Sequence, residues 1–370
     1  MKISQFLNKD NNNLDLVRIT LACMVIIGHS QGLNGLGGYW IDPIKYFFEF
    51  TYSGALAVKL FLFISGLVVT NSYLHKRNAT YFIISRFFRI VPALLFVLII
   101  TVFVFGLMVT KLGVYDYLSQ LNYLAYIRHN IVFYSDYSLP GVFNDNLYPY
   151  IVNGSLWSLR YEIGCYFVLL ILFLLIRNRS KYYFIIPIVL ILIDTLMPSR
   201  FILSFIDNNP EKYLLPMCFA YGVLFAVLSD KIQINAYVVI FSIVTFVAFK
   251  DTVYVNILFI LASCNIVLYL SSRKYFLKLK PKYDISYGIY LWGFLIQQTL
   301  FHYFGHIFIG FHCVVAILVS VLLALLTFIY IEKPFIKIGK FVIDYSARSK
   351  SIEKMQIYRQ RIREDRKSVN

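Results

Sequence analysis

The chain has 370 residues, of which 59% are hydrophobic and only 15% charged, and its mean hydropathy is +0.68. Soluble domains are about half apolar and a quarter charged, so this sequence has too few charges to cover soluble domains of its length. Aromatic residues make up 18% of the sequence, which excludes an intrinsically disordered chain.

The formal net charge is +16, from 35 Lys and Arg against 19 Asp and Glu. In a membrane protein such an excess collects in cytoplasmic loops and sets the orientation, so we assign most of it to that role and expect no nucleic-acid partner. The five cysteines stand singly in apolar runs without a CxxC motif, which predicts neither a disulfide framework nor a metal site. Arg18 within the first apolar stretch, and the lack of a small-residue cleavage pattern there, argue against a cleaved signal peptide.

Ten apolar runs approach the roughly 20 residues that a membrane-spanning helix needs. They begin near Leu16, Ser53, Ile90, Leu156, Tyr182, Leu214, Ile234, Thr252, Ile285 and Gly310. With the N-terminus inside, Lys and Arg predominate in the cytoplasmic loops, while the opposite loops mix them with Asp and Glu. The sequence therefore predicts an all-α, multi-pass protein of the plasma (inner) membrane with about ten transmembrane helices and both termini in the cytoplasm.

We expect one transmembrane domain over residues 1–340 and a basic cytoplasmic tail over residues 341–370. From Lys333 onward the chain holds eleven Lys and Arg against four acids. Such a segment is typical of a tail that lies on anionic membrane lipid.

The first predicted helix contains two ionisable residues, Arg18 and His29, which lie eleven positions apart. This separation corresponds to three turns and about 20°, so both point to one face, roughly 16 Å apart along the axis. Ionisable groups inside spanning helices are costly and are usually functional or paired. A role for His29 as a hydrogen bonder between helices is the alternative.

The second predicted helix carries Lys59 and the block FLFISG, in which Ser65 and Gly66 lie at mid-depth. Small residues at this position allow helices to approach closely. The following block, SRFFRIVP, places Arg86 and Arg89 on one helical face. These arginines are either positively charged anchors at the inner surface or two guanidinium groups that bind phosphate.

A long loop from about Gly113 to Ser155 follows on the outer side and is rich in Tyr, Asn and Asp, which suits either carbohydrate contact or a membrane interface. The fourth helix opens with WSLRYE, which places Ser158 and Glu162 one turn apart near the outer boundary. Near the end of the chain, Glu332 lies at the inner boundary, at the depth of Arg18 and Arg89, where an ion pair is expected.

Taken together and in this order, these blocks resemble the acyltransferase-3 family of integral membrane O-acyltransferases. The similarity runs from Leu14 to Phe335 and comprises Arg18 with His29, FLFISG, RFFRIVP, WSLRYE, DISYGIYLW and EKPF. The resemblance implies that His29 is catalytic, that Arg18 is essential, that Arg86 and Arg89 bind the acyl donor, and that Glu332 is the family's C-terminal acidic residue. The sequence departs from the family at Gly293, where many members have His; His302 and His306 lie too far along the chain to replace it.

The resemblance also implies the reaction, transfer of an acyl group, by default acetyl, from cytoplasmic acetyl-CoA to a hydroxyl of a surface polysaccharide or its lipid-linked precursor, without a metal. Arg18 would order the catalytic site in a pair with Glu332. We add Lys59 and Ser65 to the donor site. The residues expected to contact the carbohydrate acceptor are Trp157, Ser158, Glu162 and Tyr287.

Other classes fit the sequence less well. An exporter of glycan or lipid-linked sugar would also have about ten helices and buried charges, but would more often show two related halves and broken helices, which the sequence lacks. The membrane-bound O-acyltransferases also use an intramembrane His, but late in the chain and with a neighbouring Asn. A serine hydrolase is disfavoured because no GxSxG motif occurs.

Overall fold

The structure, a computed structural model, describes residues 1–35, 42–120, 122–176, 180–197, 201–202 and 209–346. It is 77% helical, and the described residues form no β-strands, which confirms the predicted all-α class. Each of the ten predicted apolar runs coincides with a helix of the described chain. These helices are α2 (Leu14–Asn34), α4 (Ser53–Lys76), α5 (Ala79–Ile100), α9 (Leu159–Leu175), α10 (Ile185–Leu196), α11 (Pro210–Val227), α12 (Ala236–Ala248), α13 (Val255–Ser271), α15 (Ser286–Phe304) and α16 (Ile309–Thr327).

Shorter elements connect them. They are α1 (Ile3–Phe6), α3 (Pro43–Phe47), α6 (Leu107–Val109), α7 (Val114–Ser119), α8 (Asn122–Ile131), α14 (Lys274–Lys278), the 3₁₀ turns η1 (Lys9–Asn11), η3 (Gly154–Ser158) and η4 (Lys181–Phe184), and the π-helical segments η2 (Thr101–Gly106) and η6 (Phe328–Glu332).

Within the described residues, five helical segments are long and apolar enough to cross a membrane. They are Leu14–Asn34, Ser53–Lys76, Ala79–Val109, Gly154–Leu175 and Ile309–Ser346, while α12 and α13 are shorter apolar helices. The chain therefore has the helices of a membrane protein. The total of about ten crossings and the orientation of the termini stay predictions. The long last helix continues through residues 341–346, and residues 347–370 of the predicted tail lie outside the described residues.

Asparagine side chains set the starts of the helices that carry the first predicted site residues. Asn13 Oδ1 accepts a hydrogen bond from the backbone N–H of Leu16 at 3.1 Å, which begins α2. Asn78 caps α5 in the same way, also at 3.1 Å. Helix α5 thus begins at Ala79, earlier than the predicted start near Ile90, so Arg86 and Arg89 both lie inside this helix.

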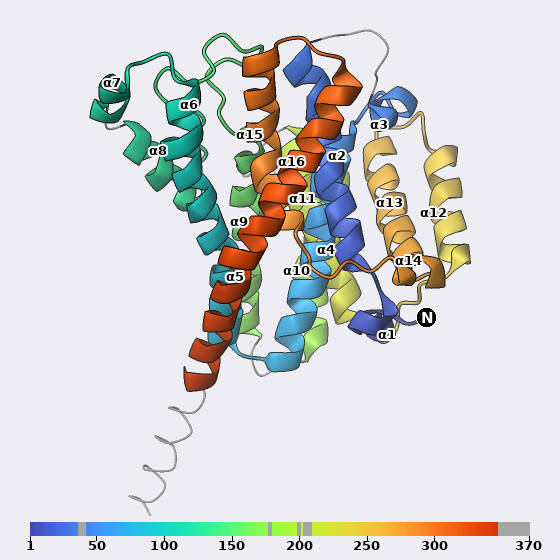
Figure 1. The fold of residues 1–370 in the computed structure, drawn as a ribbon. Coiled ribbons are helices and arrows are strands. Elements are labelled where there is room, and N and C mark those ends of the chain that lie inside the picture. Colours follow the sequence, from blue (N-terminus) through green and yellow to red (C-terminus); the bar gives the residue numbers. More distant parts are fainter. Residues whose placement is uncertain (36–41, 121, 177–179, 198–200, 203–208, 347–370) are drawn as a thin grey trace, which may run out of the picture.

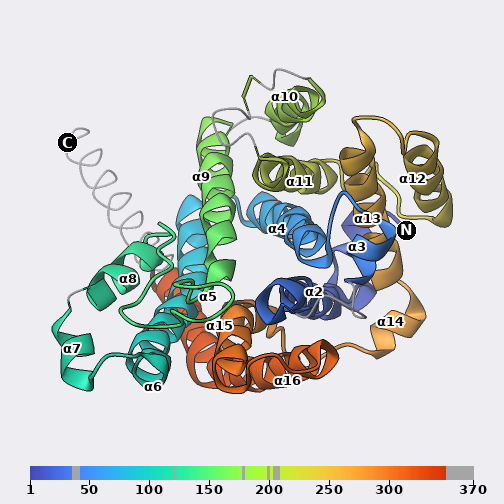
Figure 2. The same cartoon turned by 90° about the horizontal axis from the view of Figure 1, so that it is seen from above.

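The helices are arranged in layers around α4. Seen along the bundle in Figure 2, α4 lies between α11 and α2, and α2 lies between α4 and the pair α15 and α16. Helices α5 and α9 lie on one flank of this stack, and α12 and α13 on the other. In Figure 1 the N-terminus and the end of the last described helix lie at the same end of the bundle, which we call the lower end.

Glycines let α4 and α11 pack at backbone distance. A Cβ atom built on Gly66 would lie 2.2 Å from the carbonyl oxygen of Phe219, and one on Gly222 would lie 2.1 Å from the carbonyl oxygen of Phe63. These distances are far inside van der Waals contact, so only glycine fits at either position. The expected role of Gly66 in close helix packing is confirmed.

The end of the long loop descends along α15 into the bundle. Asn146 Nδ2 donates to the backbone carbonyl of Gln298 at 2.9 Å, and Gln298 Nε2 donates to the carbonyl of Ile151 at 2.7 Å. Further down α15, Asn153 Nδ2 donates to the carbonyl of Leu291 at 2.8 Å. The bonds from Asn146 and Asn153 tie the loop to α15, and the bond from Gln298 satisfies a non-helical carbonyl of the loop inside the bundle, where water is scarce.

As a result, α9 starts deep in the bundle. The Ser158 hydroxyl lies 2.6 Å from the Tyr290 hydroxyl, and Tyr290 is only one turn above the lower end of α15. The WSLRYE block was expected near the outer boundary, and this depth is wrong because the loop before the block carries it about two turns down α15.

We predict that Gly66→Leu strongly destabilises the protein, because the new side chain meets the backbone of α11. Overpacking typically costs about 1–3 kcal/mol, and contact with backbone should reach or exceed the upper end of that range. The measurement is thermal unfolding in detergent, followed by intrinsic fluorescence. Gly164→Leu on α9 is the control, because no atom lies within 4 Å of a Cβ built there. Equal melting temperatures for the two variants would contradict the assignment.

Candidate functional site

His29 lies in the upper half of α2 with one ring nitrogen already bonded. Its Nδ1 lies 2.8 Å from the carbonyl oxygen of Val25. A carbonyl only accepts, so Nδ1 carries the proton in this contact and Nε2 keeps its lone pair. The Phe294 ring meets the imidazole edge to face, with centroids 5.3 Å apart. This is the arrangement that a general base or nucleophile needs.

His29 lines a cavity of about 470 Å³ that we call the His29 cavity. Residues of α2, α3, α11, α15, the connection between α3 and α4 and the long loop line it, and most are aromatic, acidic or glycine. They are Gly28, His29, Gln31, Gly32, Leu33, Asp42, Lys45, Glu49, Phe50, Thr51, Tyr52, Tyr148, Glu211 and Phe294. Gly28 permits this geometry, because a Cβ atom there would lie 2.4 Å from the backbone nitrogen of Gly54 at the start of α4.

A second, narrower cavity of about 90 Å³ lies between α2, α4, α5, α9 and α15, and we call it the Arg86 cavity. It is lined by Arg18, Val58, Phe61, Leu62, Ile64, Ser65, Val68, Val69, Arg86, Ser158, Leu159, Glu162, Tyr166, Ser286, Tyr287 and Tyr290. The structure thus brings together predicted catalytic, donor-binding and acceptor-binding residues. They are Arg18, Ser65, Arg86, Ser158, Glu162 and Tyr287.

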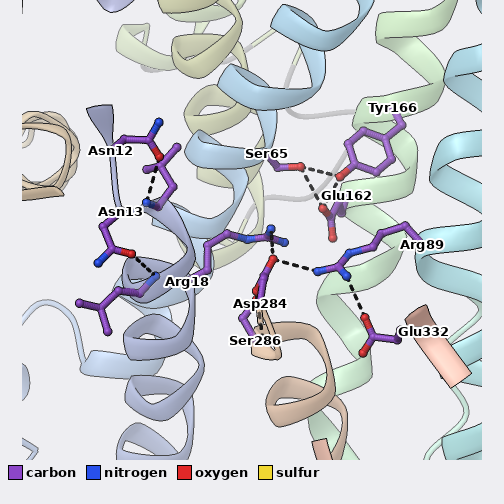
Figure 3. A network of polar contacts seen from close by, with 12 residues as sticks. Asn12, Asn13, Arg18, Ser65, Arg89, Glu162, Tyr166, Asp284, Ser286 and Glu332 are labelled. Carbon is purple, nitrogen blue, oxygen red and sulfur yellow. Dashed lines mark hydrogen bonds and ion pairs between the residues drawn. The ribbon is translucent and has the colours of Figure 1, made fainter. Parts of the chain in front are cut away.

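The Arg86 cavity contains a carboxylate held by two hydroxyl groups. Glu162 Oε1 accepts hydrogen bonds from Ser65 Oγ at 3.0 Å and from the Tyr166 hydroxyl at 2.5 Å (Figure 3). Ser65 therefore does more than reduce the spacing between helices. Tyr166 was missed in the sequence analysis, although its position one turn after Glu162 on α9 was an available signal.

Beside this cavity, charged residues from α2, α5, η6 and the segment before α15 form one chain of ion pairs (Figure 3). Asp284 Oδ2 lies 2.6 Å from Arg18 Nη1 and 2.9 Å from Arg89 Nη2. The other terminal nitrogen of Arg89, Nη1, lies 2.9 Å from Oε2 of Glu332, which belongs to the π-helical segment η6. The expected ion pair of Glu332 exists, but its partner is Arg89 and not Arg18.

Asp284 is the central anion of this network, and the sequence analysis did not single it out. Its other oxygen accepts from the Ser286 hydroxyl at 2.6 Å and from the Ser286 backbone N–H at 3.2 Å. Burial alone would raise the pKa of Asp284, but the charges of Arg18 and Arg89 and the bonds from Ser286 lower it to about 2. Its place just before α15, in the block DISYGIYLW that carries the family resemblance, could have identified it as a candidate site residue.

The two cavities are neighbours along α15. Tyr290 lines the Arg86 cavity and Phe294 lines the His29 cavity, and they are one helical turn, about 6 Å, apart. On α2, Arg18 lines the lower cavity and His29 the upper one, in keeping with the shared helical face predicted for them. A donor bound from the lower end and an acceptor bound from the upper end would thus approach each other near His29.

Four predicted site residues line neither cavity, and Glu332, in the ion-pair network, is one of them. Lys59 is buried beside the His29 cavity and pairs with Glu211, away from the arginines with which it was grouped. Trp157 packs against Tyr161, with ring centroids 5.7 Å apart, and lines neither cavity. Arg89 lies in the ion-pair network beside the Arg86 cavity.

The position where many family members have His is tightly packed here. A Cβ atom on Gly293 would lie 2.7 Å from a side-chain carbon of Ile26 on α2. His306 Nδ1 donates to the Asn34 carbonyl at 2.7 Å, and His302 packs against Phe143. Neither histidine lines either cavity, in agreement with the expectation that they do not replace the missing side chain.

We predict that Asp284→Asn lowers the stability of the protein by about 3 kcal/mol at neutral pH, because two arginines lose their shared carboxylate. The folded pKa lies below the ordinary Asp value of about 3.9, so this stabilisation is complete above that pH and disappears as the pH falls toward 2. Thermal unfolding of both proteins between pH 7 and pH 2 measures the difference. Asp230→Asn, which breaks an exposed pair with Lys181, is the control. A difference that persists unchanged at pH 2 would contradict the assignment.

Comparisons with known proteins show the family of the chain. The family model described as an acyltransferase domain matches residues 11–331, which include every predicted site residue except Glu332. The chain is 25% identical over 309 residues to the O-acetyl transferase of Shigella phage Sf6, covering 78% of this chain and 86% of the relative. It is 26% identical over 365 residues to Nodulation protein 10 of Rhizobium leguminosarum bv. viciae, covering 88% and 94%.

No solved structure matches the chain significantly. The family match favours an enzyme over the alternative of an exporter, because it spans nearly the whole chain. The chain belongs to the acyltransferase-3 family and is a membrane-embedded O-acyltransferase.

Proposed function

We propose that the protein transfers an acetyl group from cytoplasmic acetyl-CoA to a hydroxyl of a surface polysaccharide or its lipid-linked precursor. The observation that carries this proposal is the position of His29, which has a free Nε2 and lines one cavity one helical turn along α15 from a second cavity lined by Arg18 and Arg86. The relative named O-acetyl transferase supports acetyl as the acyl group.

The donor side is proposed at the Arg86 cavity. A cavity of about 90 Å³ has room for the acetyl end of the donor, while the pantetheine arm, the nucleotide and its phosphates extend toward the mouth. Among the described residues Arg86 has no ion pair, so its guanidinium is available for phosphate. Arg89, in contrast, is bonded to Asp284 and Glu332. The two arginines of the RxxR block thus have different roles: Arg86 binds the donor and Arg89 positions α5.

The acceptor side is proposed at the His29 cavity. Neutral His29 takes the proton of the acceptor hydroxyl at Nε2 while the oxygen attacks the thioester carbon. The new C–O ester bond forms, the C–S bond breaks, and the proton passes to the departing thiolate of CoA. In the second route, Nε2 attacks the thioester carbon, the C–S bond breaks and CoA leaves as the thiolate. The acceptor hydroxyl then attacks the acetyl-imidazole, the C–N bond breaks, and the hydroxyl proton passes to the thiolate. Both routes use the same ring nitrogen.

We further propose that the protein crosses the plasma (inner) membrane ten times with its lower end in the cytoplasm. The position of both described ends at this lower end supports an even number of crossings. The alternation of Lys and Arg between loops supports the orientation. In this orientation the Arg86 cavity is on the cytoplasmic side of His29, and the basic residues after Lys333 lie near anionic lipid.

His29→Ala is predicted to lower acetyl transfer by about 10²–10⁴-fold through loss of the base or nucleophile. The assay uses native membranes with radiolabelled acetyl-CoA and follows both CoA release and label in the glycan fraction. His302→Ala, in a histidine that lines neither cavity, should retain wild-type activity. Full activity in His29→Ala would contradict the catalytic assignment, and no turnover in the wild type would contradict the proposed reaction.

Arg86→Ala is predicted to raise the KM for acetyl-CoA by about 10–100-fold, the effect of losing a hydrogen bond to a charged group. It should leave the KM for S-acetylpantetheine unchanged, because that donor lacks the nucleotide phosphates. Arg89→Ala should instead lower the melting temperature, since it leaves Glu332 and Asp284 without a partner they now share. Equal effects of Arg86→Ala on both donors would contradict the proposed phosphate contact.

A further inference from the structure

A buried lysine holds a carboxylate at the wall of the His29 cavity. Lys59 Nζ, from α4, lies 2.6 Å from Glu211 Oε2, in the first turn of α11. The Lys59 side chain is only 3% exposed, whereas that of Glu211 is 34% exposed and lines the cavity. Lys59 therefore contacts Glu211 from the protein interior, and Glu211 lines the same cavity as His29.

The pair is a costly way to join two helices. Removing an ammonium group from water costs several kcal/mol, and a buried ion pair is often no more stabilising than apolar residues of the same size. Helices α4 and α11 are already packed at backbone distance through Gly66 and Gly222. Packing of α4 against α11 therefore does not require an ion pair at this position.

One oxygen of Glu211 is left for another partner. Oε2 accepts from Lys59, and among the described residues Oε1 has no hydrogen bond. Asp42, another acid of the cavity wall, differs in this respect. Its oxygens accept from the backbone of Ile44 at 2.8 Å and from the backbone and hydroxyl of Ser53 at 2.9 and 2.6 Å, so it fixes the starts of α3 and α4.

The remaining wall of the His29 cavity suits an uncharged sugar. The rings of Phe50, Tyr52, Tyr148 and Phe294 offer flat apolar surface, and the acids Asp42, Glu49 and Glu211 outnumber the one lysine of the lining, Lys45. With the Lys59 ammonium held against Glu211, these groups leave one net negative charge at the wall, which disfavours a carboxylate or phosphate on the acceptor. Hydroxyl groups, as hydrogen-bond donors, are instead complementary to a fixed carboxylate.

We propose that Glu211 accepts a hydrogen bond from a hydroxyl of an uncharged acceptor sugar in the His29 cavity, and that Lys59 is a positioning residue that orients Glu211. This inference rests on the proposed acetyl transfer and identifies the part of the site that recognises the acceptor. Glu211 thereby holds the sugar so that a neighbouring hydroxyl reaches Nε2 of His29.

The test separates binding of the acceptor from binding of the donor. Purified protein is assayed with radiolabelled acetyl-CoA and increasing amounts of glycan extracted from the source cells. Glu211→Gln should raise the half-saturating glycan concentration at least tenfold and leave the KM for acetyl-CoA within twofold of wild type. Lys59→Met should act in the same direction. Lys181→Met, in an exposed pair with Asp230, is the control and should change neither value.

A double variant distinguishes this role from a merely structural ion pair. Lys59→Met combined with Glu211→Leu removes both charges, and its melting temperature reports whether the apolar pair restores the packing. We expect recovery of stability relative to Lys59→Met without recovery of glycan saturation. Normal glycan saturation in Glu211→Gln or in the double variant would overturn the proposal.

The class of acceptor is tested with the same glycan after chemical reduction of its carboxyl groups. Transfer that is undiminished is expected for an uncharged acceptor sugar, and loss of transfer would overturn that part of the proposal. If wild-type protein labels no glycan at all, the proposed acetyl transfer itself fails. The two failures are therefore distinguishable.

Discussion

The arrangement of the candidate site depends on one carboxylate, Asp284, that two arginines share. Through Arg18 and Arg89 it joins α2 to α5, and through Arg89 the network reaches Glu332 in the π-helical segment η6 of the last helix. A guanidinium buried among helices needs an anion nearby, because its desolvation is otherwise too costly. This requirement holds together α2, α5, the segment before α15 and the last helix, which are distant in the sequence, and places Arg18 at the wall of the Arg86 cavity.

The irregular loop before α9 determines how the two cavities meet. Its Asn146 and Asn153 side chains bond to the backbone of α15 and bring Ser158 to the hydroxyl of Tyr290. Non-helical backbone at this depth is possible only because neighbouring side chains satisfy it. Helix α9 consequently starts inside the bundle, and its Glu162 reaches the same cavity as Arg86 instead of the outer surface.

The two cavities differ in a way that matches two different substrates. The Arg86 cavity is narrow and has an arginine that is not engaged in an ion pair within the described chain, which suits a long chain that carries phosphates. The His29 cavity is about five times larger, by 470 against 90 Å³, and is aromatic and acidic. His29 has its bonded nitrogen turned to its own helix and the other free for chemistry. Lys59, grouped with the arginines on the basis of its charge, serves the larger cavity.

The sequence by itself determined the helical class, the location of ten apolar helices, the close packing at Gly66 and the family, because apolar periodicity and ordered motifs are local properties of the chain. It also indicated that Arg18 and His29 share a face of α2, since helix geometry alone relates them. Only the tertiary structure decided that Arg18 pairs with Asp284, that Glu332 pairs with Arg89 and that Glu162 faces the arginines. Those contacts join residues more than 70 positions apart, and their geometry depends on how helices pack and on how deeply a loop enters the bundle.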